Sequence, residues 1–137
     1  MKEVKRPLNV TTLVLYAALV ALSPATGYAG DKLNPGEMLR RGEHLTSGNG
    51  QYRLIMQDDG NLVLYDASNR PLWASNTDGK AVEKCIMQED GNLVLYLYNG
   101  QPVWASNTDG KPGSFLVLQN DGNVVIYHPV WASNTAR

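Results

Sequence analysis

The sequence has few cysteines, little net charge and no long hydrophobic run, the features that stabilise many small proteins or direct them to a cellular location. Its 137 residues include one cysteine and one phenylalanine, and the formal net charge is −1. The lone cysteine, Cys85, excludes an internal disulfide, so stability must come from packing. We expect its side chain to be a small buried apolar group, with an intermolecular disulfide as the alternative. Because the basic residues are few and scattered, we predict that the chain does not bind nucleic acid or anionic membrane surfaces.

Long hydrophobic runs are also missing, since a membrane-spanning helix needs about 20 apolar residues. The main apolar run, residues 13–22, follows a basic amino terminus and precedes the small residues of Gly27-Tyr28-Ala29. This order is typical of an export signal. We predict a signal peptide over residues 1–29 with cleavage near Ala29, and a mature domain over residues 30–137 that does not insert into membranes. The protein would be secreted, or periplasmic if bacterial; an uncleaved anchor is the alternative.

What the sequence does contain is a nine-residue string that occurs three times. The copies begin at Gln57, Gln88 and Gln119, a fixed step of 31 residues. Each copy keeps Gln, Asp, Asn, Val and Tyr at alternate positions. Folding alone requires an apolar pattern and turns, so the repeated amide, carboxylate and phenol predict three copies of one binding site.

Around each copy the pattern is that of β-strands and turns. Strand-like segments flank an Asp-Gly or Asn-Gly turn, and a further strand ends in tryptophan, without sustained helical periodicity after residue 30. The domain is therefore predicted to be all-β, with short strands at its Leu/Gly-rich start. Three such units can share one core about a common axis. We expect Trp73, Trp104 and Trp131 to pack there, and a tighter last hairpin at His128-Pro129.

Strand alternation assigns the residues of the motif to two faces. Asn61, Val63 and Tyr65 share one face, and the leucines between them point to the core. With Asp59 and Gln57 nearby, this face offers donors and acceptors around a small apolar spot, which suits a polyol. Turn formation alone would explain the Asp-Gly-Asn sequence. It would not explain why Gln and Tyr recur in register.

The pattern Gln-x-Asp-x-Asn-x-Val-x-Tyr resembles the mannose-binding motif of the monocot mannose-binding lectins, the bulb-type or snowdrop-agglutinin-like family. The likeness covers about residues 31–135. It implies a β-prism II fold of three four-stranded antiparallel sheets around a pseudo-threefold axis, with no cofactor and no metal. It also implies three mannose sites, formed by Gln57, Asp59, Asn61, Val63 and Tyr65; by Gln88, Asp90, Asn92, Val94 and Tyr96; and by Gln119, Asp121, Asn123, Val125 and Tyr127.

The resemblance implies a role for each residue type. The Asp and Asn bind the axial O2 of mannose, Gln binds O3, Tyr binds O4, and Val packs on C3 and C4. It further implies a homodimer built by exchange of carboxy-terminal strands, here residues 130–135. The sequence departs from the plant pattern at Gly60, which stands at a half-cystine position, in its missing carboxy-terminal extension and in its short third hairpin. These departures predict a non-plant member.

The predicted function is recognition of terminal mannose on glycans or polysaccharides by a lectin that is not an enzyme. A glycoside hydrolase needs two carboxylates roughly 5 to 10 Å apart, but Asp59, Asp90 and Asp121 lie on different units. A lectin-like secreted toxin or bacteriocin that targets cell-surface glycans is the alternative. His44 and the Arg40-Arg41 pair are expected to be solvated surface.

Overall fold

The computed structural model describes residues 30–136, and these form strands, turns and loops only. The all-β prediction is confirmed. The predicted signal peptide lies outside the described residues. Within them, no helix is long and apolar enough to cross a membrane.

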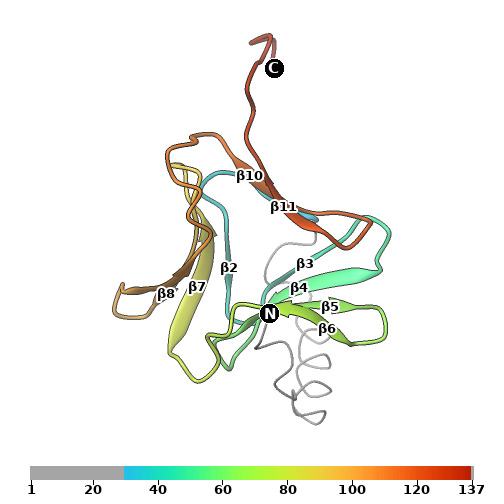
Figure 1. Cartoon of the computed structure of the whole chain (residues 1–137), viewed down its shortest axis with the longest axis vertical. Helices are drawn as coiled ribbons and strands as arrows, with labels where there is room; N and C mark the ends of the chain where they lie inside the picture. The colour runs from blue at the N-terminus through green and yellow to red at the C-terminus, as the bar shows by residue number, and fades with distance from the viewer. Residues whose placement is uncertain (1–29, 137) are drawn as a thin grey trace.

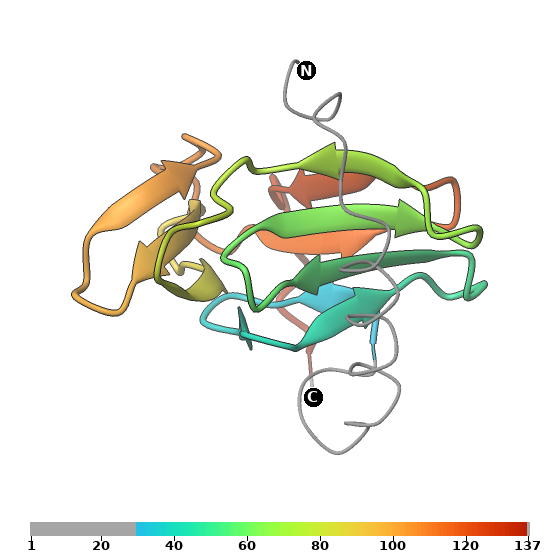
Figure 2. The ribbon, with the colours of Figure 1, turned by 90° about the horizontal axis from the view of Figure 1, so that it is seen from below.

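Eleven strands form three antiparallel sheets that surround a common centre (Figure 1). One sheet has the order β3-β4-β5-β6, with strands His44–Thr46, Tyr52–Met56, Leu62–Asp66 and Pro71–Ala74. The second has the order β2-β7-β8-β9, with strands Met38–Arg40, Val82–Met87, Leu93–Leu97 and Pro102–Ala105. The third has the order β1-β10-β11, with strands Lys32–Leu33, Phe115–Leu118 and Val124–Tyr127. Figure 2 shows the first of these sheets face on, with its strands lying side by side.

The Leu/Gly-rich start supplies one short edge strand to each sheet. Leu33, Leu39 and Leu45 lie in β1, β2 and β3, and each is 0% exposed. The six-residue step between these leucines thus carries the chain from one sheet to the next, while each leucine points to the same core. The prediction of short strands is confirmed.

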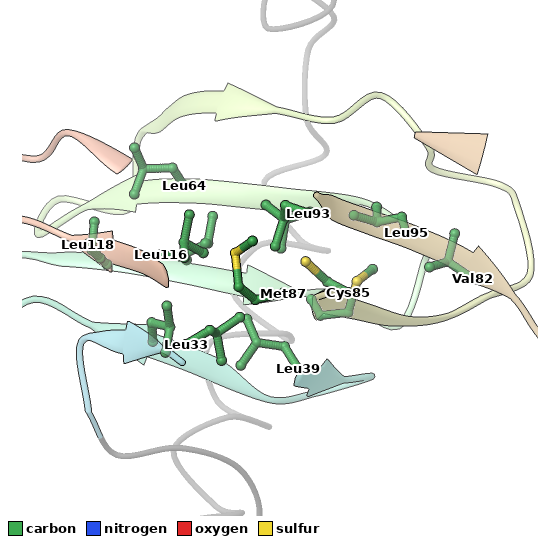
Figure 3. Packing of buried hydrophobic residues seen from close by; sticks show 14 residues of the cluster. Leu33, Leu39, Leu64, Val82, Cys85, Met87, Leu93, Leu95, Leu116 and Leu118 are labelled. Atoms are coloured by element: carbon green, nitrogen blue, oxygen red, sulfur yellow. The ribbon is translucent and has the colours of Figure 1, made fainter. Parts of the chain in front are cut away.

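The core occupies the space enclosed by the inner faces of the sheets. Figure 3 shows leucines of all three sheets meeting around Met87 and Cys85. Cys85 is fully buried in β7, opposite Leu95 of β8, and burial raises its pKa to about 12. It is the small core side chain that the sequence predicts. Trp73 and Trp104 both pack against this core. Their rings meet each other edge to face, with centroids 5.6 Å apart.

The third sheet has three strands within this chain instead of the expected four, because residues 130–134 pair with no strand. Trp131 is 81% exposed, so its predicted place beside the other tryptophans is wrong for this chain. In Figure 1 the carboxy-terminal segment runs away from the sheets. The cause is the length of the preceding loop. In the first unit residues 66–70 separate Tyr65 from Pro71, whereas in the third His128 alone separates Tyr127 from Pro129. Since a hairpin loop needs about two residues or more, the predicted tighter hairpin does not form.

Candidate functional site: three polar clusters on the outer faces

Each motif copy lies at a tight turn between the two central strands of a unit. The turns are β4–β5, β7–β8 and β10–β11. In each, the Gln backbone N–H donates to the Asn carbonyl at 2.9 Å, and the Gly N–H donates to the Gln carbonyl. Backbone geometry is therefore the same in the three copies. The alternation predicted from sequence is also confirmed, because Leu62 and Leu64 lie in the core while Val63 and Tyr65 pack in a separate outer cluster.

A hydrogen-bond chain joins the Tyr, Gln and Asp side chains of every copy. In the first, the Tyr65 hydroxyl donates to Gln57 Oε1 at 2.7 Å, and Gln57 Nε2 donates to Asp59 at 3.5 Å. In the second and third copies the equivalent tyrosines also donate to their glutamines, and the Gln-to-Asp distances are 3.1 Å. Each glutamine is thereby held in one orientation, with its amide nitrogen beside the carboxylate.

The asparagine of the motif is fixed from behind by the strand that carries tryptophan. Asn61 Oδ1 accepts hydrogen bonds from the backbone N–H groups of Asn76 and Thr77, at 2.8 and 3.2 Å, and from Ser75 Oγ at 3.3 Å. Its Nδ2 donates to no other described residue. Because the oxygen is used by the protein, the amide nitrogen is the group left for a ligand. Asn92 is anchored in the same way, by Ser106 and Thr108.

The third asparagine has no such anchor in this chain. Residues 130–135 correspond to the segments that hold Asn61 and Asn92, but they pair with no strand. Within residues 30–136, no hydrogen bond is made to the Asn123 side chain. Asn123 is exposed, whereas Asn92 is half-buried. The third cluster therefore has its carboxylate, amide and phenol in place but lacks the support behind its asparagine.

An apolar patch adjoins the polar groups of each cluster. Val63 is paired with Ile55 on one side and Ala74 on the other, and Val94 with Ile86 and Ala105. Paired residues of an antiparallel sheet share a face, so these side chains form one small apolar surface. Val125 has a partner on one side only, Val117.

The carboxylates differ in their surroundings. The N–H of Asn92 donates to Asp90, and the N–H of Asn123 to Asp121. These backbone hydrogen bonds are the largest cause of a lowered pKa in both carboxyl groups, and the hydrogen bonds from the glutamine amides are the second. In the first copy burial is the largest effect, and it raises the pKa of Asp59.

The first cluster as a whole is the most enclosed of the three. Gln57 and Asn61 are each 2% exposed, while their counterparts in the other copies are half-buried or exposed. The first copy also makes hydrogen bonds that the second lacks among the described residues: Asn76 N–H donates to Asn61 Oδ1, and Arg41 donates to the Asp58 carbonyl. No cluster of three or more His, Cys, Asp or Glu side chains within residues 30–136 could hold a metal ion.

Comparison with known proteins assigns the family. No protein-family model matches the chain. The mannose-specific agglutinin from snowdrop (Galanthus nivalis) bulbs, solved in complex with methyl-α-D-mannoside, is 47% identical; the match covers 78% of this chain and 98% of that one, with a TM-score of 0.67. The chain belongs to the bulb-type, monocot mannose-specific lectin family. The Polygonatum cyrtonema lectin, complexed with monomannoside, is 43% identical over 77% of this chain and 97% of that one, with a TM-score of 0.68.

Membership of the bulb-type lectins confirms the β-prism fold and a carbohydrate-binding protein without catalysis, and it does not favour the toxin alternative. The mannose-specific lectin of Narcissus pseudonarcissus is 50% identical over 52 residues, which are 38% of this chain and 39% of that relative. The chain thus matches less than half the length of the first curated relatives. Relatives include Galanthus and Allium lectins as well as one from Scorpaena plumieri. The predicted non-plant origin is not borne out by these matches.

The residues that hold the motif asparagines were not predicted from the sequence, nor was a structural role for Arg41. Ser75 and Thr77, with Ser106 and Thr108, hold the motif asparagines, and their repetition in the Trp-Ala-Ser-Asn-Thr segments was a usable signal. The prediction that Arg41 is merely solvated is wrong. Its guanidinium donates to the carbonyls of Val82, Asp58 and Lys80. His44 is half-buried, and desolvation lowers its pKa.

Proposed function

We propose that the chain binds terminal mannose of glycans or polysaccharides through its three outer clusters, without a metal. The observation that carries this proposal is the set of groups that each cluster leaves unused. An Asn amide nitrogen, the remaining Asp lone pairs, the second Gln amide hydrogen and the Tyr oxygen lie together beside an apolar patch. A hexose has hydroxyls that both donate and accept, and C–H surfaces that favour apolar contact.

The roles follow the family pattern. Asp59 and Asn61 together bind one hydroxyl, which donates to the carboxylate and accepts from the amide. Gln57 and Tyr65 hold the neighbouring hydroxyls, and Val63 covers ring carbons. The second and third sites use Asp90 with Asn92 and Asp121 with Asn123, alongside the matching Gln, Tyr and Val residues. Binding an axial O2 in this way selects mannose over glucose, whose O2 is equatorial. The snowdrop and Polygonatum lectins, whose structures contain bound mannosides, support this ligand.

Retention on mannose-agarose tests the proposal. The protein should bind and be eluted by methyl mannoside but not by methyl glucoside. Asp59→Ala/Asp90→Ala/Asp121→Ala should not be retained, because a charged acceptor is lost in each site. Asp58→Ala/Glu89→Ala is the matched control, since it removes exposed carboxylates one residue away in two of the same turns. Retention of the triple variant equal to that of the unmodified protein would contradict the site assignment.

We further propose that the chain is exported and that residues 1–29 are removed. The basic, apolar and small-residue order of that segment supports export. Intact mass of the protein recovered outside the cytoplasm, with a new amino terminus at Gly30, is the expected result. Recovery of the full-length chain in the cell would contradict it.

We also propose a homodimer in which residues 130–135 are exchanged. The β11 strand is an edge with no neighbour on one side, and exposed edges favour pairing with another chain. A groove of about 650 Å³ lies next to it, lined by apolar residues that include Trp73, Trp104 and Ile126. In the other two units the equivalent strand edge, that of β5 or β8, is paired with the unit's own tryptophan strand. The proposed occupant is Trp131 of a second copy.

The exchanged segment already has the shape of its counterparts. Asn134 has φ 62°, against 64° for Asn76 and 60° for Asn107. Ser133 Oγ lies 2.6 Å from Thr135 Oγ1, as the Ser and Thr side chains of the other two segments do at 2.8 and 2.7 Å. It could therefore anchor the partner's Asn123 as Ser106 and Thr108 anchor Asn92. Dimerisation would then complete the third site.

Light scattering during gel filtration tests the exchange. The protein should elute as a dimer. Replacing His128 by Asp-Ala-Ser-Asn-Arg, the residues that separate Tyr65 from Pro71 in the first unit, should give a monomer because the last strand could then fold back onto β11. Trp131→Ala should weaken the dimer. A monomeric unmodified protein, or an unchanged dimer after loop replacement, would contradict strand exchange.

A further inference from the structure

The three units meet at corners where the motif turn of one sheet approaches a loop of the next. Beside the first site, this corner holds two side chains that the proposed mannose sites do not use. Arg41 Nε donates to the Val82 carbonyl at 2.5 Å and Nη2 to the Lys80 carbonyl at 3.3 Å, while Nη1 donates to the carbonyl of Asp58, the residue before the site carboxylate. The guanidinium is thus fixed between the motif turn of the first unit and the segment that leads into β7 of the second.

Tyr98 lies on this guanidinium. The Arg41 Cζ atom is 5.5 Å from the centre of the Tyr98 ring, and Tyr98 N–H donates to the Ala81 carbonyl at 3.1 Å. A cation–π contact of this kind orients the ring. Tyr98 nevertheless remains 62% exposed. Val130 and Trp131 are also exposed, but they belong to the unpaired segment and Tyr127 to the motif. The exposure of Tyr98 has no such explanation.

The other two corners lack this pair. Tyr98 stands two residues after the motif tyrosine, where the other units have Ala67 and Pro129. Arg41 stands two residues after Leu39, where the neighbouring steps have Pro35 and Ser47. Because two corners of the same fold form without an Arg–Tyr contact, the fold does not require one. The pair therefore distinguishes the first site from its two copies.

We propose that Arg41 and Tyr98 form a second sugar subsite next to the first mannose site, which stacks the adjoining hexose of an oligosaccharide. This inference rests on the proposed function. Tyrosine offers a rigid, amphipathic surface with little conformational entropy to lose, and the remaining Arg41 N–H groups can donate to sugar hydroxyls. The first site would then prefer oligosaccharides to monosaccharides, whereas the second and third would not gain from this corner.

Calorimetry on single-site proteins tests the subsite. In Asp90→Ala/Asp121→Ala protein, which keeps the first site, adding Tyr98→Ala should weaken binding of a methyl mannobioside about 3- to 10-fold, the range expected of one aromatic contact. Affinity for methyl mannoside should stay the same. Tyr98→Phe should restore bioside binding, since it keeps the ring. In Asp59→Ala/Asp121→Ala protein, which keeps the second site, Tyr98→Ala should affect neither ligand.

The outcomes separate this inference from the proposed function. Unaltered bioside affinity, an equal loss for both ligands, or an equal effect on the second site would each overturn the subsite. Binding of methyl mannoside by the second site but not by the first would also overturn it, while leaving mannose binding at the second site standing. Failure of every single-site protein to bind either mannoside would reject the proposed function itself.

Discussion

Gly60 and Gly79 allow steric crowding to be separated from backbone strain within one unit. Gly60 lies in the turn of the first site with φ +94°, and a Cβ there would meet the Lys80 carbonyl oxygen at 2.3 Å and that of Thr77 at 2.9 Å. Gly79 has φ +83°, and a Cβ there would meet nothing within 4 Å. Both glycines have left-handed backbone, so Gly60→Ala and Gly79→Ala share the strain and differ in the clash.

The expected costs follow from these contacts. A non-glycine residue in the left-handed region costs about 1 to 2 kcal/mol, and this is the whole effect expected for Gly79→Ala. Gly60→Ala must in addition displace backbone oxygens, and crowding of this kind costs about 1 to 3 kcal/mol more. The combined loss of about 2 to 5 kcal/mol is large against a domain stability of about 5 to 15 kcal/mol. Displacing Thr77 would also disturb the anchor of Asn61.

Urea denaturation followed by tryptophan fluorescence measures both variants. Gly60→Ala should have the clearly lower midpoint, with little change in the slope of the transition. Equal losses of stability would refute the argument that packed carbonyls require the glycine. The same contacts bear on the half-cystine that the family resemblance places here. Any side chain at position 60 would meet these oxygens, so this backbone holds glycine rather than a disulfide.

Three other predictions address the core, the sites and their support. Cys85 should resist thiol reagents in the native protein, because it is fully buried with a pKa near 12, and should react when urea unfolds the chain; rapid native labelling would contradict the packing. The lowered pKa of Asp90 and Asp121 should keep their carboxylates charged, so that retention on mannose-agarose persists as the pH falls to 3.8 and is lost below it; their contribution to stability should fade in the same direction. Ser106→Ala should cost about 1 to 3 kcal/mol in urea denaturation, because it leaves the Leu93 N–H without its partner; the exposed Ser133→Ala should cost a dilute monomer nothing.

Strand alternation correctly predicted which side chains of the motif face the core and which face outward. Leucines and motif side chains alternate with period two, and a one-residue error would have placed every leucine on the wrong face. The recurrence of Gln57 and Tyr65 in each copy likewise indicated a function beyond the turn. In the structure these two side chains are hydrogen-bonded to one another.

The contacts between units could not be predicted in the same way. Arg41 is 57 residues from Tyr98 in the chain, and only the meeting of two sheets brings them together. The unpaired last strand had a visible cause in the short connection at His128. The short spacing is compatible with a tighter hairpin as well as with an unpaired strand, and only the structure shows that residues 130–134 leave the sheet.

The three sites are therefore unequal for reasons outside their identical motifs. The first adjoins Arg41 and Tyr98, the second is supported entirely by its own unit, and the third lacks support behind Asn123 within this chain. If residues 130–135 are exchanged as we propose, assembly and ligand binding are coupled at the third site alone. In the proposed dimer, residues 130–135 of the partner subunit order Asn123, so a ligand that binds this site stabilises the dimer to the same extent. Under this proposal, ligand binding at the third site depends on protein concentration, while the other two sites bind independently of it.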